Sequence, residues 1–412
     1  MPHLPRIAVL VDLPRGEGAG GHVKYWERLA QAAARVPPLL DLTVYFSGSG
    51  PDEPLASHVR YRFLPPVFST ARLKFLSYVP AHTDLAPFHP RLAKELSAYD
   101  LIHTTDACFA FARTAERVAG RKNIPLVTSF HTDTPAYAEV FMREMLRKRF
   151  GDGILYRLLE FLPVWERAKK DARLARHLTK CRAVLAMRIE DKELSTRLLG
   201  TERVNPMRLG VDKTIFTPQP AARSGIDARY GIAPEAFLVL FVGRVDAGKN
   251  VPRLLQACLN SVARGMNLHL LVAGKGPMES DLHAGLGARV TCAGQVAPAD
   301  LALFYAAADA LAVVSDIEIG GMVGLEALAC GCPVLASSAS HVAQACGAEE
   351  AMRTVEPSVS AWGDALVELA EDKDLRATLV QKALGFRETR LSDWDGVFLD
   401  DFAKVWLKTL GG

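Results

Sequence analysis

Short apolar runs that end in polar or glycine-rich loops, each followed by a segment with helical spacing, recur along this chain of 412 residues. The first run, residues 7–11, is followed by Asp12, the loop GEGAGGH and a helix-like segment from His22. Strands that alternate with helices in this way pair in parallel and are covered by helices on both faces. The pattern therefore predicts an α/β protein built from Rossmann-like units.

The length of the chain exceeds what one ordinary hydrophobic core accommodates, so we expect two domains. Residues 200–234 are rich in proline and glycine, which is typical of an interdomain linker. We therefore place one Rossmann-like domain at residues 1–205 and a second at residues 206–392.

The composition disfavours several classes of protein. The hydrophobic fraction is 49% and the net charge is +3, which indicates a well-buried globular protein and gives no overall electrostatic case for nucleic acid. Secretion and membrane spanning are not expected, because the chain has no long apolar run and its N-terminus lacks a cleavage site. The seven cysteines form no CxxC pair, so we expect a cytoplasmic protein with reduced cysteines and no metal site.

Four successive predicted strands of the second half, residues 237–242, 268–273, 289–292 and 310–314, end in glycine, basic or acidic residues. Their loops begin with Gly243-Arg244, with Gly274-Lys275-Gly276-Pro277, with Gly294-Gln295-Val296 and with the segment that carries Glu318. Because the carboxyl ends of parallel strands meet at one edge of a sheet, we expect these loops to form one site.

The first of these loops contains Arg244 and Lys249, and a helical pattern begins at Val251. Two cations beside a helix N-terminus can hold a diphosphate. A P-loop is disfavoured, because Asn250 stands where Ser or Thr would bind magnesium and the glycine spacing differs. An ordinary basic turn remains the alternative.

Residues 313–336 combine an apolar run, an acidic loop, two glycines and a short helical segment. Glu318 precedes Gly320 and Gly321, and Glu326 lies on the predicted helix. If this helix begins near Gly321, its free N–H groups and its dipole form an anion site beside the two carboxylates. Such a site suits a phosphate flanked by hydroxyls, as in a nucleotide-sugar.

Two strand ends of the first half carry further candidates. Gly20 and Gly21 follow the first strand and could approach a phosphate, but their spacing does not match GxGxxG, and a turn that needs glycine explains them equally well. His131 and Asp133 follow the strand at residues 125–129, where α/β sites place polar groups. A structural histidine is the alternative there.

Residues 139–182 are the most basic part of the chain. From Val164 on, basic and apolar residues fall on opposite helical faces, which fits a surface helix with its apolar face in the core. In residues 139–163, basic and aromatic side chains are interleaved, a pattern that also suits an anionic membrane surface. The sequence leaves both interpretations open.

These motifs resemble glycosyltransferase family 4, whose members are retaining enzymes of the GT-B fold with two Rossmann-like domains that face each other across a cleft. The resemblance rests on Gly243-Arg244 with Lys249-Asn250, Gly274–Pro277, Gly294–Val296, Glu318-x7-Glu326 with Gly331–Pro333, Gly20-Gly21 and His131-Thr-Asp-x-Pro-x-Tyr137. The last of these is similar to members that glycosylate diacylglycerol-type lipids.

The resemblance implies a role for each candidate residue. Arg244 and Lys249 would hold the donor diphosphate, Glu318 the sugar hydroxyls and Glu326 the ribose, while His131 would face the sugar. The other implied substrate-binding residues are Gly20, Gly21, Asp133, Gly243, Gly274, Gly276, Pro277, Val296, Gly320, Gly321 and Met322. No metal and no cofactor are implied.

The implied reaction moves a hexosyl group from a nucleotide-sugar, a UDP-sugar first of all, to an acceptor. We expect a membrane glycerolipid as acceptor and a peripheral location at the inner face of the cytoplasmic membrane, with residues 139–182 at its anionic surface. The domain at 1–205 would lie on the acceptor side, with a C-terminal helix at 393–412 packed onto it, and the domain at 206–392 would bind the donor. A saccharide acceptor, a nucleotide-sugar binder without catalysis and an epimerase of the same fold are the alternatives.

The chain departs from the family pattern at three positions. Gly320 stands where a bulky residue is usual, Val314 where proline is usual, and Leu209 where asparagine commonly precedes Gly-Val-Asp. These departures leave the identity of the donor sugar open.

Overall fold

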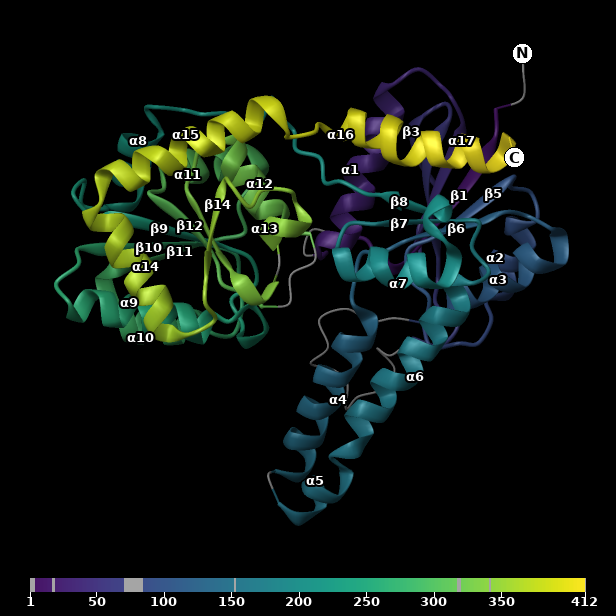
Figure 1. Cartoon of the computed structure of the whole chain (residues 1–412), viewed down its shortest axis with the longest axis horizontal. Coiled ribbons are helices and arrows are strands. Elements are labelled where there is room, and N and C mark those ends of the chain that lie inside the picture. Colours follow the sequence, from purple (N-terminus) through teal and green to yellow (C-terminus); the bar gives the residue numbers. More distant parts are fainter. Residues whose placement is uncertain are drawn as a thin grey trace. The chain divides into compact units, whose positions relative to one another are not determined.

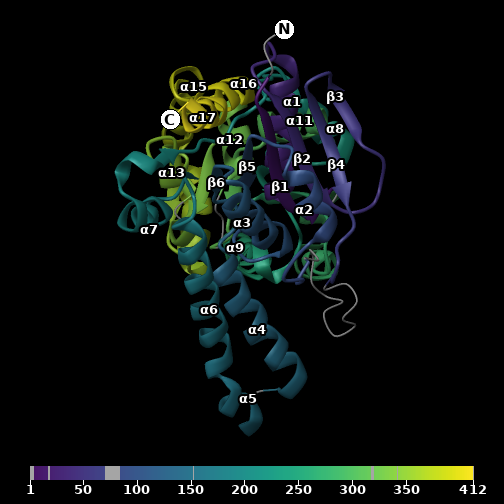
Figure 2. The same cartoon turned by 90° about the vertical axis from the view of Figure 1, so that its right-hand side faces the viewer.

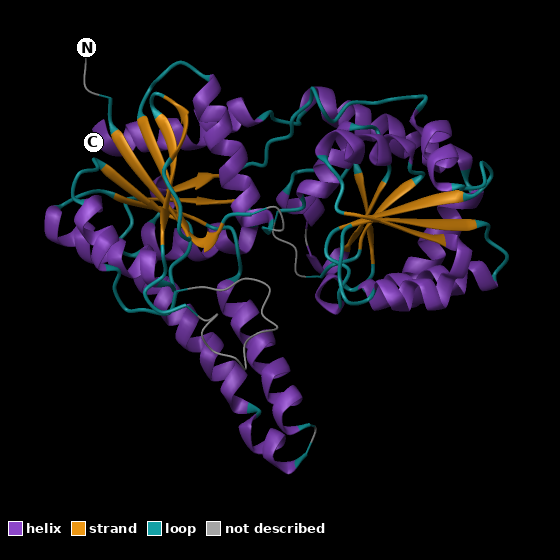
Figure 3. Cartoon of the chain, turned by 180° about the vertical axis from the view of Figure 1, so that it is seen from behind, coloured by secondary structure: helices purple, strands orange, loops and turns teal. Residues whose placement is uncertain are grey.

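The computed structural model describes residues 4–16, 19–69, 84–151, 153–316, 320–340 and 342–411. The chain divides into unit 1, Met1–Arg208 with Trp394–Gly412, and unit 2, Leu209–Asp393. Each unit is built around one largely parallel sheet with helices on both faces (Figures 1 and 3). The predicted α/β fold with two Rossmann-like domains is therefore confirmed.

The sheet of unit 1 has the strand order β3-β4-β2-β1-β5-β6-β7-β8. All neighbouring pairs are parallel except β3 with β4. The strands are β1 (Arg6–Pro14), β2 (Asp41–Ser47), β3 (Glu53–Ala56), β4 (Val59–Leu64), β5 (Leu101–Thr104), β6 (Leu126–Ser129), β7 (Ala183–Ala186) and β8 (Val204–Pro206).

Strand β1 lies between β2 and β5, and its apolar run is continuous because both of its faces are covered. In the register, Val9 pairs with Val44 on one side and with His103 on the other. The order of strands therefore reverses between β1 and β5. Ligands of open α/β sheets bind at such a switch point, beyond the carboxyl ends of the strands.

Helices from both ends of the chain cover the sheet of unit 1. They are α1 (Gly21–Arg35), α2 (Pro90–Leu96), α3 (Ala110–Lys122), α7 (Ile189–Leu199), α16 (Trp394–Gly396), the π-helical turn η7 (Val397–Ala403) and α17 (Lys404–Gly411). Phe402 and Trp406 of the C-terminal segment are fully buried, and Asp401 accepts hydrogen bonds from Arg208. The C-terminal segment is thus part of the core of unit 1.

A helical hairpin between β6 and β7 extends away from the sheet of unit 1 (Figures 1 and 2). It consists of α4 (Thr134–Phe150), α5 (Ile154–Leu159) and α6 (Phe161–Leu178). His177 and Leu178 at its base are fully buried. Val164 and Trp165, near its tip, are each 56% exposed.

The apolar face that the sequence predicts for residues 164–182 therefore lies in the core only near the base of the hairpin, at Leu174 and Leu178. The reason lies in the lengths of the elements. The 18 residues of α6 span about 27 Å, whereas the four residues of β6 span about 13 Å. Most of α6 therefore has no sheet beneath it.

Unit 2 contains a parallel sheet with the order β11-β10-β9-β12-β13-β14. Its strands are β9 (Phe237–Val242), β10 (Leu268–Ala273), β11 (Val290–Gly294), β12 (Ala310–Val313), β13 (Val334–Ser337) and β14 (Met352–Val355). Its longer helices are α8 (Ala222–Tyr230), α9 (Val251–Ala263), α10 (Glu279–Leu286), α11 (Pro298–Ala307), α12 (Met322–Ala329), α14 (Val359–Glu371) and α15 (Lys373–Thr389). The second switch point lies between β9 and β12.

The proline-rich stretch at residues 200–234 is more ordered than a linker. Its beginning supplies β8, which pairs with β7, and its end supplies α8, which packs beside α11. The chain passes from unit 1 to unit 2 at Arg208 and returns at Trp394.

Two further properties concern the chain as a whole. None of the described helices combines the length and the apolar character that crossing a bilayer requires. Each of the seven cysteines is a free thiol, so their expected reduced state agrees with the structure.

Candidate functional site

The loop that follows β9 positions two predicted cationic residues at the switch point of unit 2. Asp246 accepts a hydrogen bond from the backbone N–H of Lys249 at 3.0 Å, which closes a short turn before α9. Nη2 of Arg244 lies 3.2 Å from a carboxylate oxygen of Asp246, and the Arg244 side chain remains 47% exposed. Helix α9 begins at Val251, as predicted, so both cations precede a helix N-terminus.

Asn250 joins the loops on the two sides of the switch point. Its backbone is left-handed, with φ of 54°, a conformation that asparagine tolerates better than most residues. Its side-chain Nδ2 donates to the carbonyl oxygen of Val314, just beyond β12, at 3.1 Å. Asn250 is therefore a connector between loops, a role that its sequence position does not reveal.

A partly buried ion pair anchors the beginning of the loop after β12. Arg253 donates to both carboxylate oxygens of Asp316 at 2.8 and 2.7 Å, and Ser337 donates to one of them at 2.6 Å. Burial alone would raise the pKa of Asp316, but these hydrogen bonds lower it overall. The sequence interpretation missed Arg253 and Asp316; their only signal was a basic residue one turn into α9 and an acid two residues before Glu318.

Two of the predicted binding glycines have a structural reason to be glycine. A Cβ atom on Gly274 would lie 1.8 Å from the carbonyl oxygen of Gly243, and one on Gly276 would lie 2.3 Å from that of Val245. The backbone N–H of Gly274 also donates to the carbonyl oxygen of Gly294 at 2.7 Å. The loops after β9, β10 and β11 therefore pack against one another at one edge of the sheet.

Pro277 and Val296 belong to the same edge. Pro277 lies between β10 and α10, and Val296 lies between β11 and α11. The parallel sheet thus brings these two residues to the side of Arg244, as expected from the strand ends.

Glu318 lies outside the described residues. Gly321, which is described, precedes α12 with a left-handed φ of +56°, and a Cβ atom there would lie 2.3 Å from Cγ1 of Val342. The helix begins at Met322, as predicted. A Cβ atom on Gly320 would lie 3.7 Å from the methyl groups of Leu209, so two of the departures from the family pattern are neighbours in space.

Glu326 is oriented by a residue that the sequence interpretation did not single out. The hydroxyl of Tyr305 on α11 donates to Oε2 of Glu326 at 3.0 Å. Burial, with the charge of Glu326, raises the pKa of the fully buried Tyr305 well above 10, so this hydroxyl keeps its proton. Nothing in the spacing of Tyr305 and Glu326 signals the pairing, because they lie on different helices.

In unit 1 the predicted residues His131 and Asp133 line one cavity of about 40 Å³, together with Thr105 and Asp106 of the loop after β5. Asp133 accepts from the backbone N–H of Ala136 at 3.0 Å and so caps α4. This capping gives Asp133 a structural role, whatever it binds.

Buried rings surround His131. His22 stacks on it with ring centroids 4.6 Å apart, and Trp26 Nε1 donates to its Nε2 at 3.1 Å. Burial, followed by the neighbouring His22 and His103, lowers the pKa of His131 well below 6.5. His131 is therefore neutral over the physiological range of pH.

Gly20 and Gly21 lie at the N-terminus of α1, beside the first switch point. Gly20 has φ of −70°, a value open to any residue, and a Cβ atom on it would meet nothing within 4 Å. The turn therefore does not require glycine at Gly20, which leaves close approach of a ligand as the remaining interpretation of that residue.

The described residues contain no group of three or more His, Cys, Asp or Glu side chains placed to hold a metal ion.

Comparison with known proteins supports these assignments at the level of family and fold. The family model "Glycosyltransferase Family 4" matches residues 19–214, and the model "Glycosyl transferases group 1" matches residues 223–385. The D-inositol 3-phosphate glycosyltransferase of Rhodococcus opacus is 32% identical over 216 residues, which cover 48% of each chain. That of Salinispora arenicola is 35% identical over 205 residues, with coverage of 44% of this chain and 45% of its own. The chain thus matches these relatives over about half of their length.

Solved structures share the fold over nearly the whole chain. HepE of Anabaena, in complex with UDP and glucose, superposes with a TM-score of 0.68 at 18% identity, covering 99% of this chain and 100% of its own. Sucrose-phosphate synthase of Thermosynechococcus elongatus gives a TM-score of 0.70 at 20% identity, covering 99% of both chains. With both halves matched by family models and both sheets arranged as in these structures, the chain belongs to glycosyltransferase family 4, with the GT-B fold.

Proposed function

We propose that this protein transfers a hexosyl group from a UDP-sugar to an acceptor, with retention of configuration at the sugar carbon. The observation that carries the proposal is the switch point of unit 2. There, Arg244 and Lys249 precede the N-terminus of α9, and Gly321 precedes the N-terminus of α12. Both flank the crevice between β9 and β12, where open sheets bind their ligands.

The chemistry of the reaction matches this arrangement. Departure of a nucleoside diphosphate from the sugar develops negative charge on the diphosphate, and fixed cations and helix dipoles stabilise such charge. In the proposed reaction, the bond from the sugar carbon to the diphosphate oxygen breaks, a bond to the acceptor oxygen forms on the same face, and the acceptor proton passes to the departing diphosphate. No metal or cofactor takes part in the proposed mechanism.

The proposed donor contacts follow the sequence interpretation. Glu326, oriented by Tyr305, would bind the ribose, and Val296 would lie against the base. Gly243, Gly274, Gly276 and Pro277 would line the same side, while Gly320, Gly321 and Met322 would offer backbone N–H groups to the sugar next to Glu318. UDP is the preferred nucleotide because HepE, which shares the fold, is described in complex with UDP and glucose.

Loss of one cation tests the proposal. Arg244→Ala or Lys249→Ala is expected to lower kcat by roughly 10²-fold, as removal of a transition-state charge partner does. The measurement is release of UDP from a panel of UDP-sugars in the presence of a lipid extract. Arg264→Ala is the matched control, because Arg264 is 49% exposed, forms an ion pair with Asp364 and lies at the far end of α9. Wild-type rates in both site variants would refute the assignment.

The preferred acceptor is a membrane glycerolipid, and the helical hairpin of unit 1 is the reason. Its tip exposes apolar side chains that no described part of the chain covers: Ile154 (80%), Leu158 (66%), Phe161 (62%) and Trp165 (56%). Ile154 and Leu158 are four residues apart on α5, and Phe161 and Trp165 are four residues apart on α6, so the members of each pair share a helical face. An exposed apolar cluster of this kind marks a surface that binds something.

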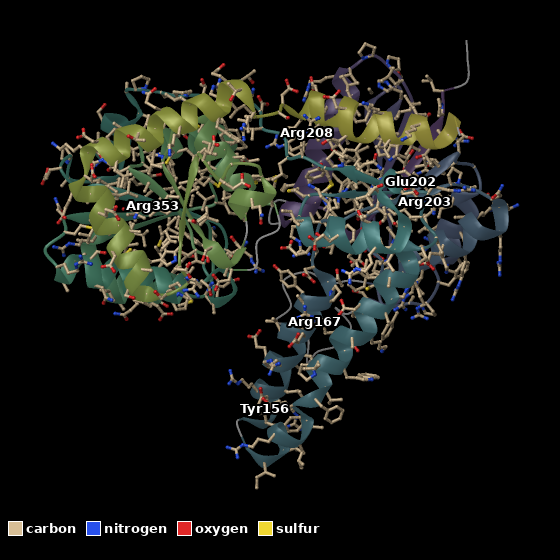
Figure 4. All side chains as sticks on the ribbon, viewed as in Figure 1. Tyr156, Arg167, Glu202, Arg203, Arg208 and Arg353 are labelled. Atoms are coloured by element: carbon tan, nitrogen blue, oxygen red, sulfur yellow. The ribbon has the colours of Figure 1, made fainter. Side chains whose placement is uncertain are left out.

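Charge indicates what that surface binds. Residues 143–170 contain eight Lys or Arg and four Asp or Glu, an excess of four, whereas the whole chain has an excess of only three. Lys169 lies over the ring of Trp165 at 5.1 Å, and Arg149 and Arg157 are exposed near the tip. Tyr156 is buried inside the distal end of the hairpin, and Arg167 lies nearer its base (Figure 4).

We therefore propose that the hairpin tip inserts its apolar face into an anionic bilayer, with the basic residues at the headgroups. Aromatic and apolar side chains beside cations are the combination that binds such an interface. A peripheral location on the inner face of the cytoplasmic membrane follows from this proposal. A glycerolipid acceptor would then be presented at the same surface.

Co-sedimentation with vesicles tests the membrane proposal. The protein is expected to sediment with phosphatidylglycerol vesicles, much less with phosphatidylcholine vesicles, and less at high salt. The double variant Phe161→Ser with Trp165→Ser should bind at least tenfold more weakly, since each buried apolar side chain contributes about 1.5–3 kcal/mol. Leu39→Ser, at a 42% exposed position of unit 1, is the control. Failure to bind anionic vesicles refutes the proposal, and concentration-dependent dimers that the double variant abolishes would identify a second copy as the partner.

Other acceptors and activities have distinct signatures. The relatives of Rhodococcus opacus and Salinispora arenicola are D-inositol 3-phosphate glycosyltransferases, so inositol phosphate belongs in the acceptor panel beside glycerolipids and envelope saccharides. Tight binding of UDP without turnover on any acceptor would indicate a nucleotide-sugar binder. An isomerised free sugar nucleotide without an acceptor would indicate an epimerase.

A further inference from the structure

A series of buried hydrogen bonds connects the C-terminal helix α17 to His131. Trp406 Nε1 donates to Nδ1 of His103 at 3.0 Å, and Nε2 of His103 lies 2.7 Å from Oγ of Ser129. Oγ of Ser129 lies 2.8 Å from Nε2 of His131. Trp406 and His103 are fully buried and Ser129 is 3% exposed, so these bonds are shielded from solvent.

The chemistry of each group fixes the direction of these bonds. An indole N–H only donates, so Nδ1 of His103 must accept from Trp406. Burial lowers the pKa of His103 to about 3, so the ring is neutral and its one proton is on Nε2. That proton is donated to Ser129, and the Ser129 hydroxyl is left to donate to Nε2 of His131.

A second, independent donor faces the same nitrogen. Trp26 Nε1 donates to Nε2 of His131 at 3.1 Å, and Trp26 is fully buried. A proton on Nε2 of His131 would point at the N–H of Trp26, which can only donate. The Ser129 hydroxyl would then accept from both histidines and would lose the acceptor of its own proton. The Trp26 branch therefore requires an unprotonated Nε2, and the Ser129 branch is satisfied by it.

We infer that His131 is held as the neutral Nδ1–H tautomer and that it donates a hydrogen bond to the ligand of the cavity beside it. Nδ1 makes no hydrogen bond to the described residues, and the His131 ring lines the cavity with Asp106 and Asp133. The positioning residues are Trp26, Ser129, His103 and Trp406. If the proposed function is correct, the acceptor of this bond is an oxygen of the transferred sugar.

This tautomer limits the part that His131 plays in the reaction. A ring nitrogen that already carries a proton cannot receive one, and Nε2 is occupied by Trp26 and Ser129. His131 is thus a hydrogen-bond donor to the substrate and not a general base. The acceptor proton must go elsewhere, as it does in the proposed transfer to the departing diphosphate.

Nitrogen NMR of the full chain without ligand tests the inference directly. In protein with ¹⁵N-labelled histidine, long-range ¹H–¹⁵N spectra distinguish protonated from unprotonated ring nitrogens, and His131→Gln assigns the resonances. We expect a protonated Nδ1 and an unprotonated Nε2 for His131 from about pH 5 to about pH 8. A proton on Nε2, or titration near the ordinary pKa of about 6.5, would overturn the inference.

Variants separate the positioning role from a merely structural one. Trp26→Phe combined with Ser129→Ala removes both donors, so a population of His131 with its proton on Nε2 should appear, while the ring stays buried and neutral. Trp406→Phe should have a smaller effect, because the Trp26 branch remains. Trp362→Phe is the matched control, since Trp362 is fully buried in unit 2 and its Nε1 has no hydrogen-bond partner among the residues that the structure describes.

The outcomes distinguish this inference from the proposed function. An unchanged tautomer in the double variant refutes the positioning role even if the enzyme is active. A fixed Nδ1–H tautomer in a protein that transfers no sugar refutes the proposed function and leaves the assignment of the tautomer intact. If the protein is active, kcat of the double variant should fall with the fraction of His131 that carries its proton on Nε2, whereas kcat of Trp362→Phe should stay at the wild-type value.

Discussion

At the scale of single residues, the site in unit 2 depends on partner side chains that hold its charged groups in place. Tyr305 directs Glu326, and Arg253 with Ser337 directs Asp316. Tyr305 and Ser337 are buried, and Arg253 is partly buried. Their contribution to binding is therefore to reduce the freedom of a ligand-binding group before the ligand arrives.

Removal of the Tyr305 hydroxyl should weaken donor binding more than turnover. Tyr305→Phe removes the hydrogen bond from Tyr305 to Glu326, and a bond to a charged group contributes about 1.5–3 kcal/mol, so KM for the nucleotide-sugar should rise roughly tenfold or more. The measurement is steady-state kinetics, with calorimetry of UDP binding as a check. Tyr230→Phe is the control, because Tyr230 lies in the same unit on α8 and its contacts with Phe304 and Arg229 are made by the ring, which phenylalanine retains. Equal effects of both substitutions would contradict the role given to Tyr305.

Residue types at strand ends were sufficient to single out Arg244, Lys249 and Glu326 from the sequence. Asn250 and Tyr305 could not be assigned, because their partners are separated from them by 64 and 21 residues and lie across the sheet edge. Spacing along the chain carries information about one helix or one strand. It carries no information about which loops contact one another in the folded protein.

At the scale of elements, a buried carboxylate helps to attach the hairpin to the rest of unit 1. Glu116 on α3 accepts from Nδ1 of His177 at 2.7 Å and pairs with Arg173 at 2.5 Å and with Lys180 at 2.7 Å. Burial alone would raise the pKa of Glu116, but these partners lower it from 4.5 to about 2. The base of α6 is thus fixed by charge as well as by apolar packing.

A depressed pKa makes the stability of this attachment dependent on pH. The ionised form is favoured in the folded state, so its contribution is complete above about pH 4.5 and is lost as the pH falls through about 2. Glu116→Gln should lower the free energy of unfolding by roughly 3 kcal/mol near neutral pH, and the difference from wild type should shrink over that acidic window. Urea denaturation at a series of pH values measures it.

Glu139→Gln is the comparison for Glu116. Glu139 pairs with Arg143 and Arg167 within the exposed hairpin, where a pair contributes at most about 1 kcal/mol. A loss for Glu139→Gln as large as that for Glu116→Gln would contradict the distinction between the base of the hairpin and its shaft.

The bounds of most elements could be predicted because residues close to each boundary in the sequence determine it. Strands β9 and β10 and helix α11 have the predicted bounds, since uniform apolar blocks define the strands and Pro298 begins the helix. The hairpin was not predicted as such. Helical spacing shows which face of a helix is apolar but not whether anything covers that face.

At the scale of the whole molecule, unit 1 is discontinuous in sequence. Unit 2 is inserted between Arg208 and Trp394, and the returning segment completes the core of unit 1 with Phe402 and Trp406. The sequence predicted two sheets and a C-terminal segment on the first domain. The passage between the units could not be placed from proline content alone, because the prolines of this region also occur next to β8 and α8.

Each unit is expected to respond separately to the loss of a buried tryptophan. Trp406→Ala should lower the local free energy of unfolding of unit 1 by about 3–5 kcal/mol, and Trp362→Ala should do the same for unit 2. Both side chains are fully buried, in different units. Hydrogen exchange measured peptide by peptide follows the two units at once. Equal loss of protection in both units from either variant would show that they unfold as one.

The contact between Trp406 and His103 also affects how the protein folds while it is synthesised on the ribosome. Its partner His103 is synthesised 303 residues earlier. At a synthesis rate of about 5–20 residues per second, roughly 15–60 s pass between the synthesis of His103 and that of Trp406. During this time the core of unit 1 lacks the Trp406 side chain. All of unit 2 is synthesised before Trp406 is. Chaperones that recognise exposed apolar surface therefore have their longest opportunity in the domain that was translated first.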